Sequence, residues 1–185
     1  MSPVSDDPRT DSQLVEAINA GDVDAFETLY RRHRDWVVKL AYRFTADREL
    51  SLDVMQETFA YVLAKFPGFE LTARFTTFLY PVVRHLAIGE QQKARRRNVT
   101  GDSPREAAAP ADSTTAADVR DELAVVMGRL SEDHREVVLM RFVDGFSLDQ
   151  ISQALRVPLG TVKSRLHHAI RALRIDPKVR KYFEA

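Results

Sequence analysis

The chain has 185 residues, of which 44% are hydrophobic and 29% charged, a composition that supports a packed core and argues against global disorder. It contains no cysteine, which excludes disulfides, thiol catalysis and cysteine-bound zinc. Lysine plus arginine equals aspartate plus glutamate at 27 each, so a nucleic-acid site would have to come from the distribution of charge rather than from its sum. No apolar run is long enough for a membrane span, and the polar, acidic N-terminus lacks the layout of a signal peptide, so we expect a cytoplasmic protein.

The first half of the chain has the apolar periodicity of helices, with spacings of three and four and no sustained alternation. This pattern covers residues 26–44, 55–66 and 75–86. Ser12 can cap an earlier short helix, and Pro67 with Gly68 closes the third helix. Because Pro81 interrupts the last pattern, we expect that helix to begin near Thr77 or to kink at the proline.

Residues 98–117 are rich in glycine, proline, alanine and small polar residues and hold almost no large apolar side chain, which predicts a flexible linker. Four short helical patterns follow. Their start signals are the capping-box pairs Thr115/Asp118 and Ser147/Gln150, the cap Ser131, and Pro158 before the last helix.

The sequence therefore predicts an all-α protein of two small helical domains. We expect a disordered N-terminus at residues 1–11, a first domain at 12–97, the linker at 98–117, a second domain at 118–178 and a tail at 179–185.

Both domains end in a basic helix. Residues 84–97 contain five basic residues and one acidic residue, and residues 159–181 contain seven and one. Such patches neutralise phosphates whatever the total charge. A solvated helix face is the other interpretation of one basic helix, but a basic helix at the end of each domain favours nucleic acid.

Residues 147–174 have the layout of a helix-turn-helix, whose second helix enters the major groove. Val162, Leu166 and Ile170 would lock the second helix onto the first, leaving its front free for DNA. The candidate DNA-binding residues of this helix are Thr161, Lys163, Ser164, Arg165, His167, His168 and Arg171, with Arg165 and Arg171 suited to phosphates. An ordinary helical hairpin is the alternative. The adjacent histidines point about 100° apart, so we expect no metal site.

Three stretches of this second domain, residues 130–139, 146–151 and 158–166, resemble region four of bacterial sigma factors of the extracytoplasmic-function (ECF) group of the sigma-70 family. Residues 53–59 resemble the region-two helix of that family that grips the beta-prime clamp of RNA polymerase. Residues 75–88 resemble the part that melts and reads the −10 promoter element.

This resemblance covers residues 12–97 and 118–175 and has specific implications. It implies a region-two helical bundle joined by the linker to a region-four helix-turn-helix that reads the −35 element. It also implies a protein without enzymatic activity or cofactor that binds core RNA polymerase, through the beta-prime clamp and the beta flap, and promoter DNA. An anti-sigma factor is a further implied partner.

The resemblance also assigns residues to the −10 element. They are Phe75, Thr76 and Thr77, in the loop that captures a flipped base; Arg84 and His85, on the following helix; and Arg95, Arg96 and Arg97, on the DNA backbone. The family usually carries tryptophan where Phe78 stands and asparagine where His85 stands. We expect core packing to explain Phe78 better than it explains Phe75.

The core-polymerase contact is assigned to an acidic helix. Asp53, Gln56 and Glu57 share one face, with Met55, Phe59 and Leu63 turned inward. An exposed acidic strip repels phosphate and therefore suits a basic protein surface, although solubility alone is the alternative.

The turn of the helix-turn-helix departs from the family, because Arg156 stands where glycine is favoured. A left-handed conformation there would cost about 1 kcal/mol. Two other functions compete with the sigma factor. An autonomous helix-turn-helix regulator would not need the helix at 53–59. An enzyme acting on nucleic acid would need catalytic groups or a phosphate loop, and the sequence lacks such motifs.

Overall fold

The computed structural model describes residues 7–99, with side chains up to residue 96, and residues 125–175. Within these ranges all regular structure is helical, which confirms the predicted fold class. The helices are α1 (Asp11–Asn19), α2 (Val23–Thr45), α3 (Arg48–Leu63), α4 (Phe75–Val99), α6 (Glu132–Phe142), α7 (Leu148–Leu155) and α8 (Leu159–Ile175). The chain divides into two compact units, Met1–Ala108 and Ala109–Ala185, and the division falls within the predicted linker.

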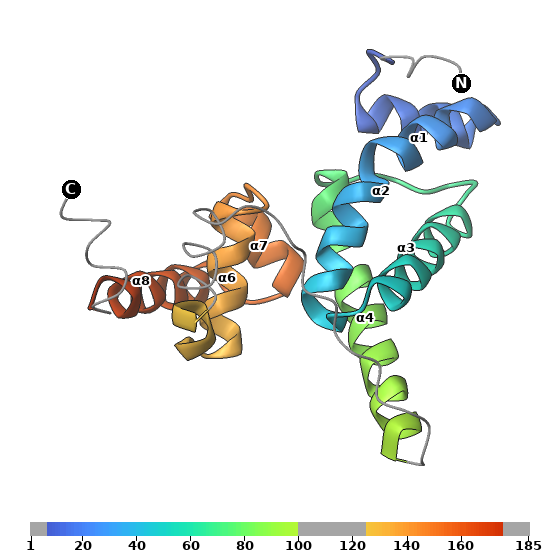
Figure 1. Cartoon of the computed structure of the whole chain (residues 1–185). Helices are drawn as coiled ribbons and strands as arrows, with labels where there is room; N and C mark the ends of the chain where they lie inside the picture. The colour runs from blue at the N-terminus through green and yellow to red at the C-terminus, as the bar shows by residue number, and fades with distance from the viewer. Residues whose placement is uncertain (1–6, 100–124, 176–185) are drawn as a thin grey trace, which may run out of the picture. The chain divides into compact units, whose positions relative to one another are not determined.

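The first unit is a bundle in which α2, α3 and α4 pack against one another and α1 packs on α2 (Figure 1). Its core is an apolar stripe from each helix at helical spacing. Fully buried members are Leu14, Leu29, Val37, Leu40, Val54, Val62, Phe75, Leu79, Tyr80 and Val83. Because burying such a side chain contributes about 1.5–3 kcal/mol, this stripe pattern selects the bundle.

The start of α1 differs from the prediction. Thr10, not Ser12, is the N-cap: its hydroxyl accepts from the backbone N–H of Gln13 at 3.3 Å, and Gln13 Oε1 accepts from the N–H of Thr10 at 2.8 Å. The reciprocal pair satisfies two backbone donors at once, whereas Ser12 as cap would offer no such reciprocity. Ser12 lies inside the first turn.

The other ends of helices in this unit follow local backbone chemistry. α3 ends at Leu63, before Pro67 and a left-handed Gly68 at φ 98°, as predicted. Leu63 itself is 52% exposed rather than turned inward, because it is the last residue of α3 and lies beyond the packed stripe. α4 begins two residues before Thr77 and contains Pro81, whose missing N–H leaves the carbonyl of Thr77 without its helical donor.

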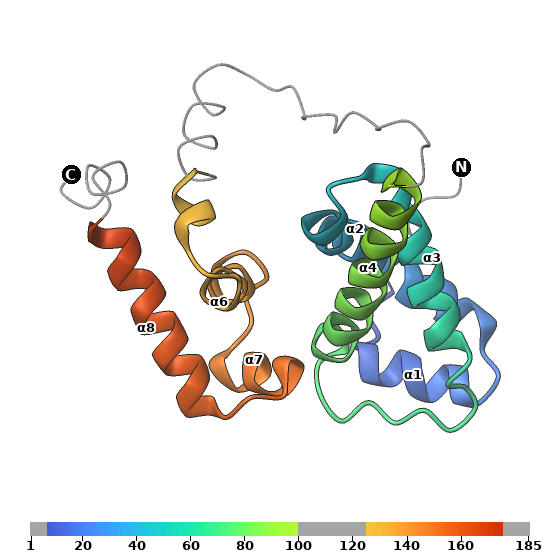
Figure 2. The same ribbon diagram turned by 90° about the horizontal axis from the view of Figure 1, so that it is seen from below.

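The segment between α3 and α4 runs past α1 (Figure 2). Asn19, at the end of α1, holds it there: its amide donates to the carbonyl of Phe69 at 2.9 Å and accepts from the N–H of Gly68 at 2.7 Å. At the other end of α4, the helix continues through Val99, two residues into the predicted linker.

The second unit consists of residues 125–130, the first five of them helical, followed by α6, α7 and α8 (Figure 2). Leu130, Val138 and Ala169 form its buried centre, with Met127, Leu166 and Leu173 packed against them. The predicted cap Ser131 and the Ser147/Gln150 capping box are confirmed, and α8 starts directly after Pro158. The pair Thr115/Asp118 and the predicted tail lie outside the described residues.

The turn between α7 and α8 contains a left-handed Arg156, with φ 55° and ψ 42°. Two hydrogen bonds close the turn: Ser152 Oγ donates to the carbonyl of Val157 at 2.6 Å, and the N–H of Val157 donates to the carbonyl of Ser152 at 3.1 Å. The conformation that favours glycine is therefore adopted by an arginine, so the cost of about 1 kcal/mol expected from the sequence for that conformation applies here. None of the described helices is both long and apolar enough to cross a membrane.

Candidate nucleic-acid and polymerase interfaces

α8 has two faces of opposite character. Val162 and Ala169 are fully buried against α6 and α7, with Leu166 and Ile170 half-buried beside them. On the other side, the predicted DNA-binding residues Lys163, Ser164, His167, His168 and Arg171 are all exposed, and Thr161 is half-buried. Five of the seven predicted DNA-binding residues of this helix are therefore exposed to solvent.

Arg165 differs from the other predicted DNA-binding residues because it has a partner. Its guanidinium forms an ion pair with the carboxylate of Asp133 in α6, and its side chain is only 24% exposed. The ring of His168 lies 6.2 Å from that of His134 in α6 and 5.6 Å from that of His167. The first turn of α6 thus borders the exposed face of α8.

The predicted loop of Phe75, Thr76 and Thr77 is the first turn of α4 instead. Phe75 is fully buried, and its ring lies 5.0 Å from that of His33. Thr77 is 4% exposed, and its hydroxyl has no hydrogen-bond partner among the described residues. Thr76 is half-buried.

The expected burial of the two phenylalanines was therefore reversed. Phe75 belongs to the inward stripe of α4 together with Leu79, whereas Phe78 is half-buried at the edge of the bundle. The ring of Phe78 lies 4.7 Å from Phe69 and 6.5 Å, nearly parallel, from Tyr61. Both aromatics belong to the apolar pattern of this segment, and that pattern alone does not show which of the two the neighbouring helices cover.

A pocket of about 350 Å³ opens next to this turn. It is lined by Asp11 and Ser12 of α1 and by Leu71, Thr72, Ala73, Arg74 and Phe75 of the segment that leads into α4. Of these residues, sequence reasoning singled out only Phe75 as a site residue. The pocket could not be found from the sequence, because its two walls are sixty residues apart and neither carries a motif.

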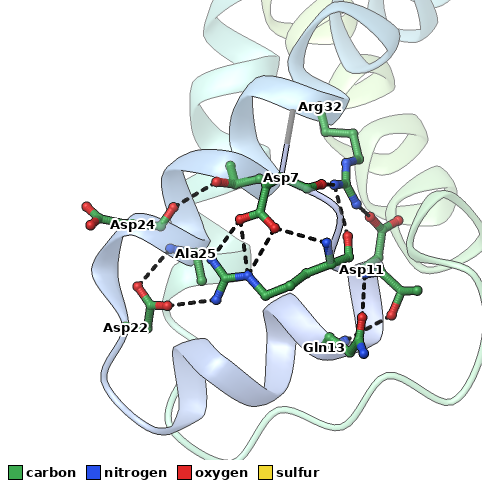
Figure 3. Close-up of polar contacts among 10 residues, drawn as sticks. Asp7, Asp11, Gln13, Asp22, Asp24, Ala25 and Arg32 are labelled. Carbon is green, nitrogen blue, oxygen red and sulfur yellow. Dashed lines mark hydrogen bonds and ion pairs between the residues drawn. The ribbon is translucent and has the colours of Figure 1, made fainter. Parts of the chain in front are cut away.

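Asp11 is fixed in this pocket wall by two side chains of α2. Its Oδ1 accepts from Arg32 Nη1 at 2.6 Å (Figure 3). Its Oδ2 accepts from His33 Nε2 at 2.9 Å. Burial works to raise the pKa of Asp11, but the hydrogen bonds from His33 and Arg32 outweigh it and the pKa is lowered. The carboxylate is therefore held in its charged form.

Residues before α1 are tied to α2 as well, so the predicted disorder does not extend over residues 7–11. Arg9 bridges Asp7 at 2.7 Å and Asp22, the N-cap of α2, at 2.8 Å (Figure 3). The hydrogen bond from Arg9 lowers the pKa of Asp7 to about 2. Arg32 also donates to the carbonyl oxygens of Asp7 and Arg9, at 3.1 and 3.0 Å. Residues 1–6 lie outside the described part.

The remaining predicted −10 residues lie along α4. Arg84 is half-buried, whereas His85, Arg95 and Arg96 are exposed. The side chain of Arg97 lies outside the described residues. Gln91 fixes this half of α4 to the end of α2, because its amide donates to the carbonyl of Phe44 at 2.8 Å.

The acidic face of α3 is exposed as predicted, with Asp53, Gln56 and Glu57 in solvent and Met55 and Phe59 buried behind them. The exposed surface of α3 is also partly apolar. Leu52, Tyr61 and Leu63 are 38%, 42% and 52% exposed, and Lys65 Nζ lies 4.6 Å above the ring of Tyr61. Across residues 7–96 and 125–175, no group of three or more metal-ligating side chains occurs.

Comparison with known proteins connects both units to one family. The chain matches the family Sigma-70 region 2 over residues 29–97 and Sigma-70, region 4 over residues 120–173. It is 36% identical over 166 residues to the ECF RNA polymerase sigma factor SigL of Mycobacterium tuberculosis, which covers 87% of this chain and 93% of the relative. It is 25% identical over 173 residues to the ECF RNA polymerase sigma factor SigW of Bacillus subtilis, covering 86% and 92%.

Two solved structures share the fold, each with a TM-score of 0.63. One is the sigma factor RpoE in complex with the anti-sigma factor NepR from Bartonella quintana, at 21% identity and covering 82% of this chain and 96% of that one. The other is CnrH in complex with the cytosolic domain of CnrY, at 19% identity and covering 94% and 97%. The alternatives of an autonomous regulator and an enzyme are thereby set aside: the chain belongs to the ECF sigma factors of the sigma-70 family, which bind core RNA polymerase and direct promoter-specific transcription initiation without catalysing a reaction.

Proposed function

We propose that α8 reads the −35 element, that the α4 side of the first unit binds the melted −10 element, and that the acidic face of α3 docks on the beta-prime clamp of core polymerase. The division of α8 into a buried and an exposed face carries this proposal. Because the buried face fixes the helix in the core, the exposed polar side chains can contact base edges without further ordering of the helix backbone.

In the −35 complex, Lys163, Ser164, His167 and His168 face base edges, and Thr161 and Arg171 bind at the sides. Arg165 reaches a phosphate only by leaving Asp133, which exchanges one ionic partner for another. The beta flap is proposed to contact the second unit, where Phe142 and Val143 are 64% and 68% exposed at the end of α6. Exposed apolar side chains side by side suit a protein partner.

In the −10 complex, the pocket beside α4 receives an unstacked base. Phe75 closes the pocket from within, and Thr76 and Thr77 belong to the turn that shapes it. Arg84 and His85 face the melted strand, and the arginines from Arg95 to Arg97 follow its backbone. Aromatic and basic groups around a polar pocket are the features that hold single-stranded bases.

The docking of α3 relies on charge and on apolar contact together. Asp53, Gln56 and Glu57 supply the acidic contact, and Leu52 and Tyr61 supply apolar surface beside it. We also infer an anti-sigma partner, by analogy with the Bartonella complex, and action in the cytoplasm, where polymerase and DNA meet.

The proposal for α3 is tested by size-exclusion chromatography of the chain with bacterial core polymerase. We expect Asp53→Ala/Glu57→Ala to weaken co-elution, because two exposed charges that face a basic surface are removed. The matched control is Glu27→Ala/Asp35→Ala, which removes two exposed carboxylates from α2. Equal loss of co-elution in both double variants would refute the assignment to α3.

A further inference from the structure

An acidic residue of α6 holds one of the basic side chains that we assign to DNA. Arg165 Nη2 in α8 forms an ion pair with Asp133 Oδ2, in the first turn of α6. The side chain of Asp133 is 56% exposed and that of Arg165 is 24% exposed, so the pair lies at the surface of the second unit. It also lies beside the exposed face of α8, because the rings of His134 and His168 are 6.2 Å apart. A carboxylate therefore stands at the edge of the proposed DNA-binding face.

The fold fixes the backbone that carries Asp133. Arg135, two residues further on, donates from Nε to the carbonyl of Met127 at 2.8 Å and so ties the first turn of α6 to the preceding segment. Behind this turn, Val138 of α6 and Ala169 of α8 belong to the same buried centre. The first turn of α6 is thus held against α8 from two sides. Separation of the ion pair has to come from rotation of the two side chains, not from movement of a helix.

A DNA phosphate can approach Arg165 in two ways, and Asp133 makes both less favourable. If the guanidinium turns towards the phosphate, the ion pair breaks and the carboxylate loses its partner. If the guanidinium stays, the phosphate comes close to the carboxylate beside it, and two like charges a few ångströms apart repel each other. A neutral side chain at position 133 would remove both costs.

We propose that Asp133 competes with DNA phosphate for Arg165 and so lowers the affinity of α8 for duplex DNA. This inference rests on the proposed −35 function of α8, in which Arg165 binds a phosphate, and adds a residue of α6 that restrains this contact. Phosphate contacts supply essentially all of the affinity for random sequence, so a restraint on one of them acts directly on nonspecific binding. Asp133 thereby reduces binding to DNA that lacks a −35 element.

The experiment measures the Kd of the full chain for a fluorescently labelled duplex of random sequence, by anisotropy at low salt and fixed pH. Asp133→Asn, Arg165→Gln and the double variant form a cycle that isolates the coupling between the two residues. Asp133→Ser is a second neutral variant, which separates the loss of charge from any effect of the asparagine itself. Glu132→Gln is the matched control, because it removes an exposed carboxylate from the same turn and the same end of the helix dipole.

We expect Arg165→Gln to weaken binding and both neutral variants of Asp133 to tighten it. An ion pair at the surface is a weak interaction, so the expected decrease in Kd is about two- to fivefold, larger than that of Glu132→Gln. In the Arg165→Gln background, Asp133→Asn should tighten binding no more than Glu132→Gln does in the wild type.

Two results would overturn the inference while leaving the proposed phosphate contact of Arg165 intact. The first is weaker or unchanged binding by both Asp133 variants when Arg165→Gln still weakens it, because Asp133 would then position Arg165 for DNA or play no part. The second is undiminished tightening by Asp133→Asn in the Arg165→Gln background, because the carboxylate would then act as a general repulsive charge. Unchanged binding by Arg165→Gln would instead refute the proposed phosphate contact itself.

Discussion

Replacement of Arg156 by glycine should stabilise the second unit. The residue is left-handed at φ 55° and its side chain is exposed, so the substitution removes strain without removing packing. The left-handed conformation costs a residue with a Cβ about 1–2 kcal/mol, which glycine avoids. Glycine has more entropy in the unfolded chain, however, and this destabilises the folded variant by about 0.5–1 kcal/mol. The expected net gain is about 0.5–1 kcal/mol, or a few degrees in the melting temperature of a domain this small.

The assay is thermal unfolding of the full chain followed by far-ultraviolet circular dichroism. Arg156→Ala is the control, because alanine keeps the strain and loses the side chain. The single tryptophan, Trp36 in α2, supplies an internal reference, since its fluorescence reports the first unit and should not shift. Equal melting temperatures for the glycine and alanine variants would refute the argument from backbone strain.

The caps of α1 can be distinguished by substitution: Thr10→Ala should cost about 1 kcal/mol of unfolding free energy in the fluorescence transition, whereas Ser12→Ala should change it little. Because the pKa of Asp11 is lowered in the fold, its charge stabilises the first unit above the unfolded value of 3.8. That stability is lost as the pH falls through the folded pKa, so Asp11→Asn should flatten acid unfolding measured by fluorescence, and an unchanged acid profile would contradict this. Asp53→Asn/Glu57→Gln should have opposite effects on two ligands, weakening core polymerase and strengthening binding of random duplex DNA in filter assays at low salt, and parallel changes would disprove the charge argument.

Local signals in the sequence predicted most of the second unit. The Ser147/Gln150 box, Ser131 and Pro158 each act within one turn of a helix, so no distant contact can move them. The resemblance to the family pointed to a glycine position at Arg156, but the sequence alone did not decide whether its backbone would be left-handed. In the first unit, the local signals predicted the wrong cap for α1. Serine and threonine can both cap a helix, and only Gln13, three residues after Thr10, distinguishes Thr10 from Ser12.

The candidate site in the first unit was less predictable because it is assembled from distant segments. The pocket joins Asp11 to Arg74, and the orientation of Asp11 depends on Arg32 and His33, one helix further on. Periodicity reports which side of one helix is buried, but it does not report which loop passes that helix. The reversal at Phe75 has a related cause, since its burial depends on packing against other helices, as with His33 of α2, which the pattern of one helix does not report.

The equal numbers of basic and acidic residues are compatible with a chain that binds two kinds of partner. In the proposed interfaces, polymerase and DNA would be recognised by opposite charges on different helices, with acidic side chains exposed on α3 and basic side chains exposed on α4 and α8. A neutral total weakens nonspecific attraction to DNA, because the acidic surface repels phosphate at a distance. Docking of α3 on polymerase would cover the acidic surface, remove its repulsion of phosphate and leave the basic helices exposed. Binding to polymerase would in this way increase the affinity of the same chain for a promoter.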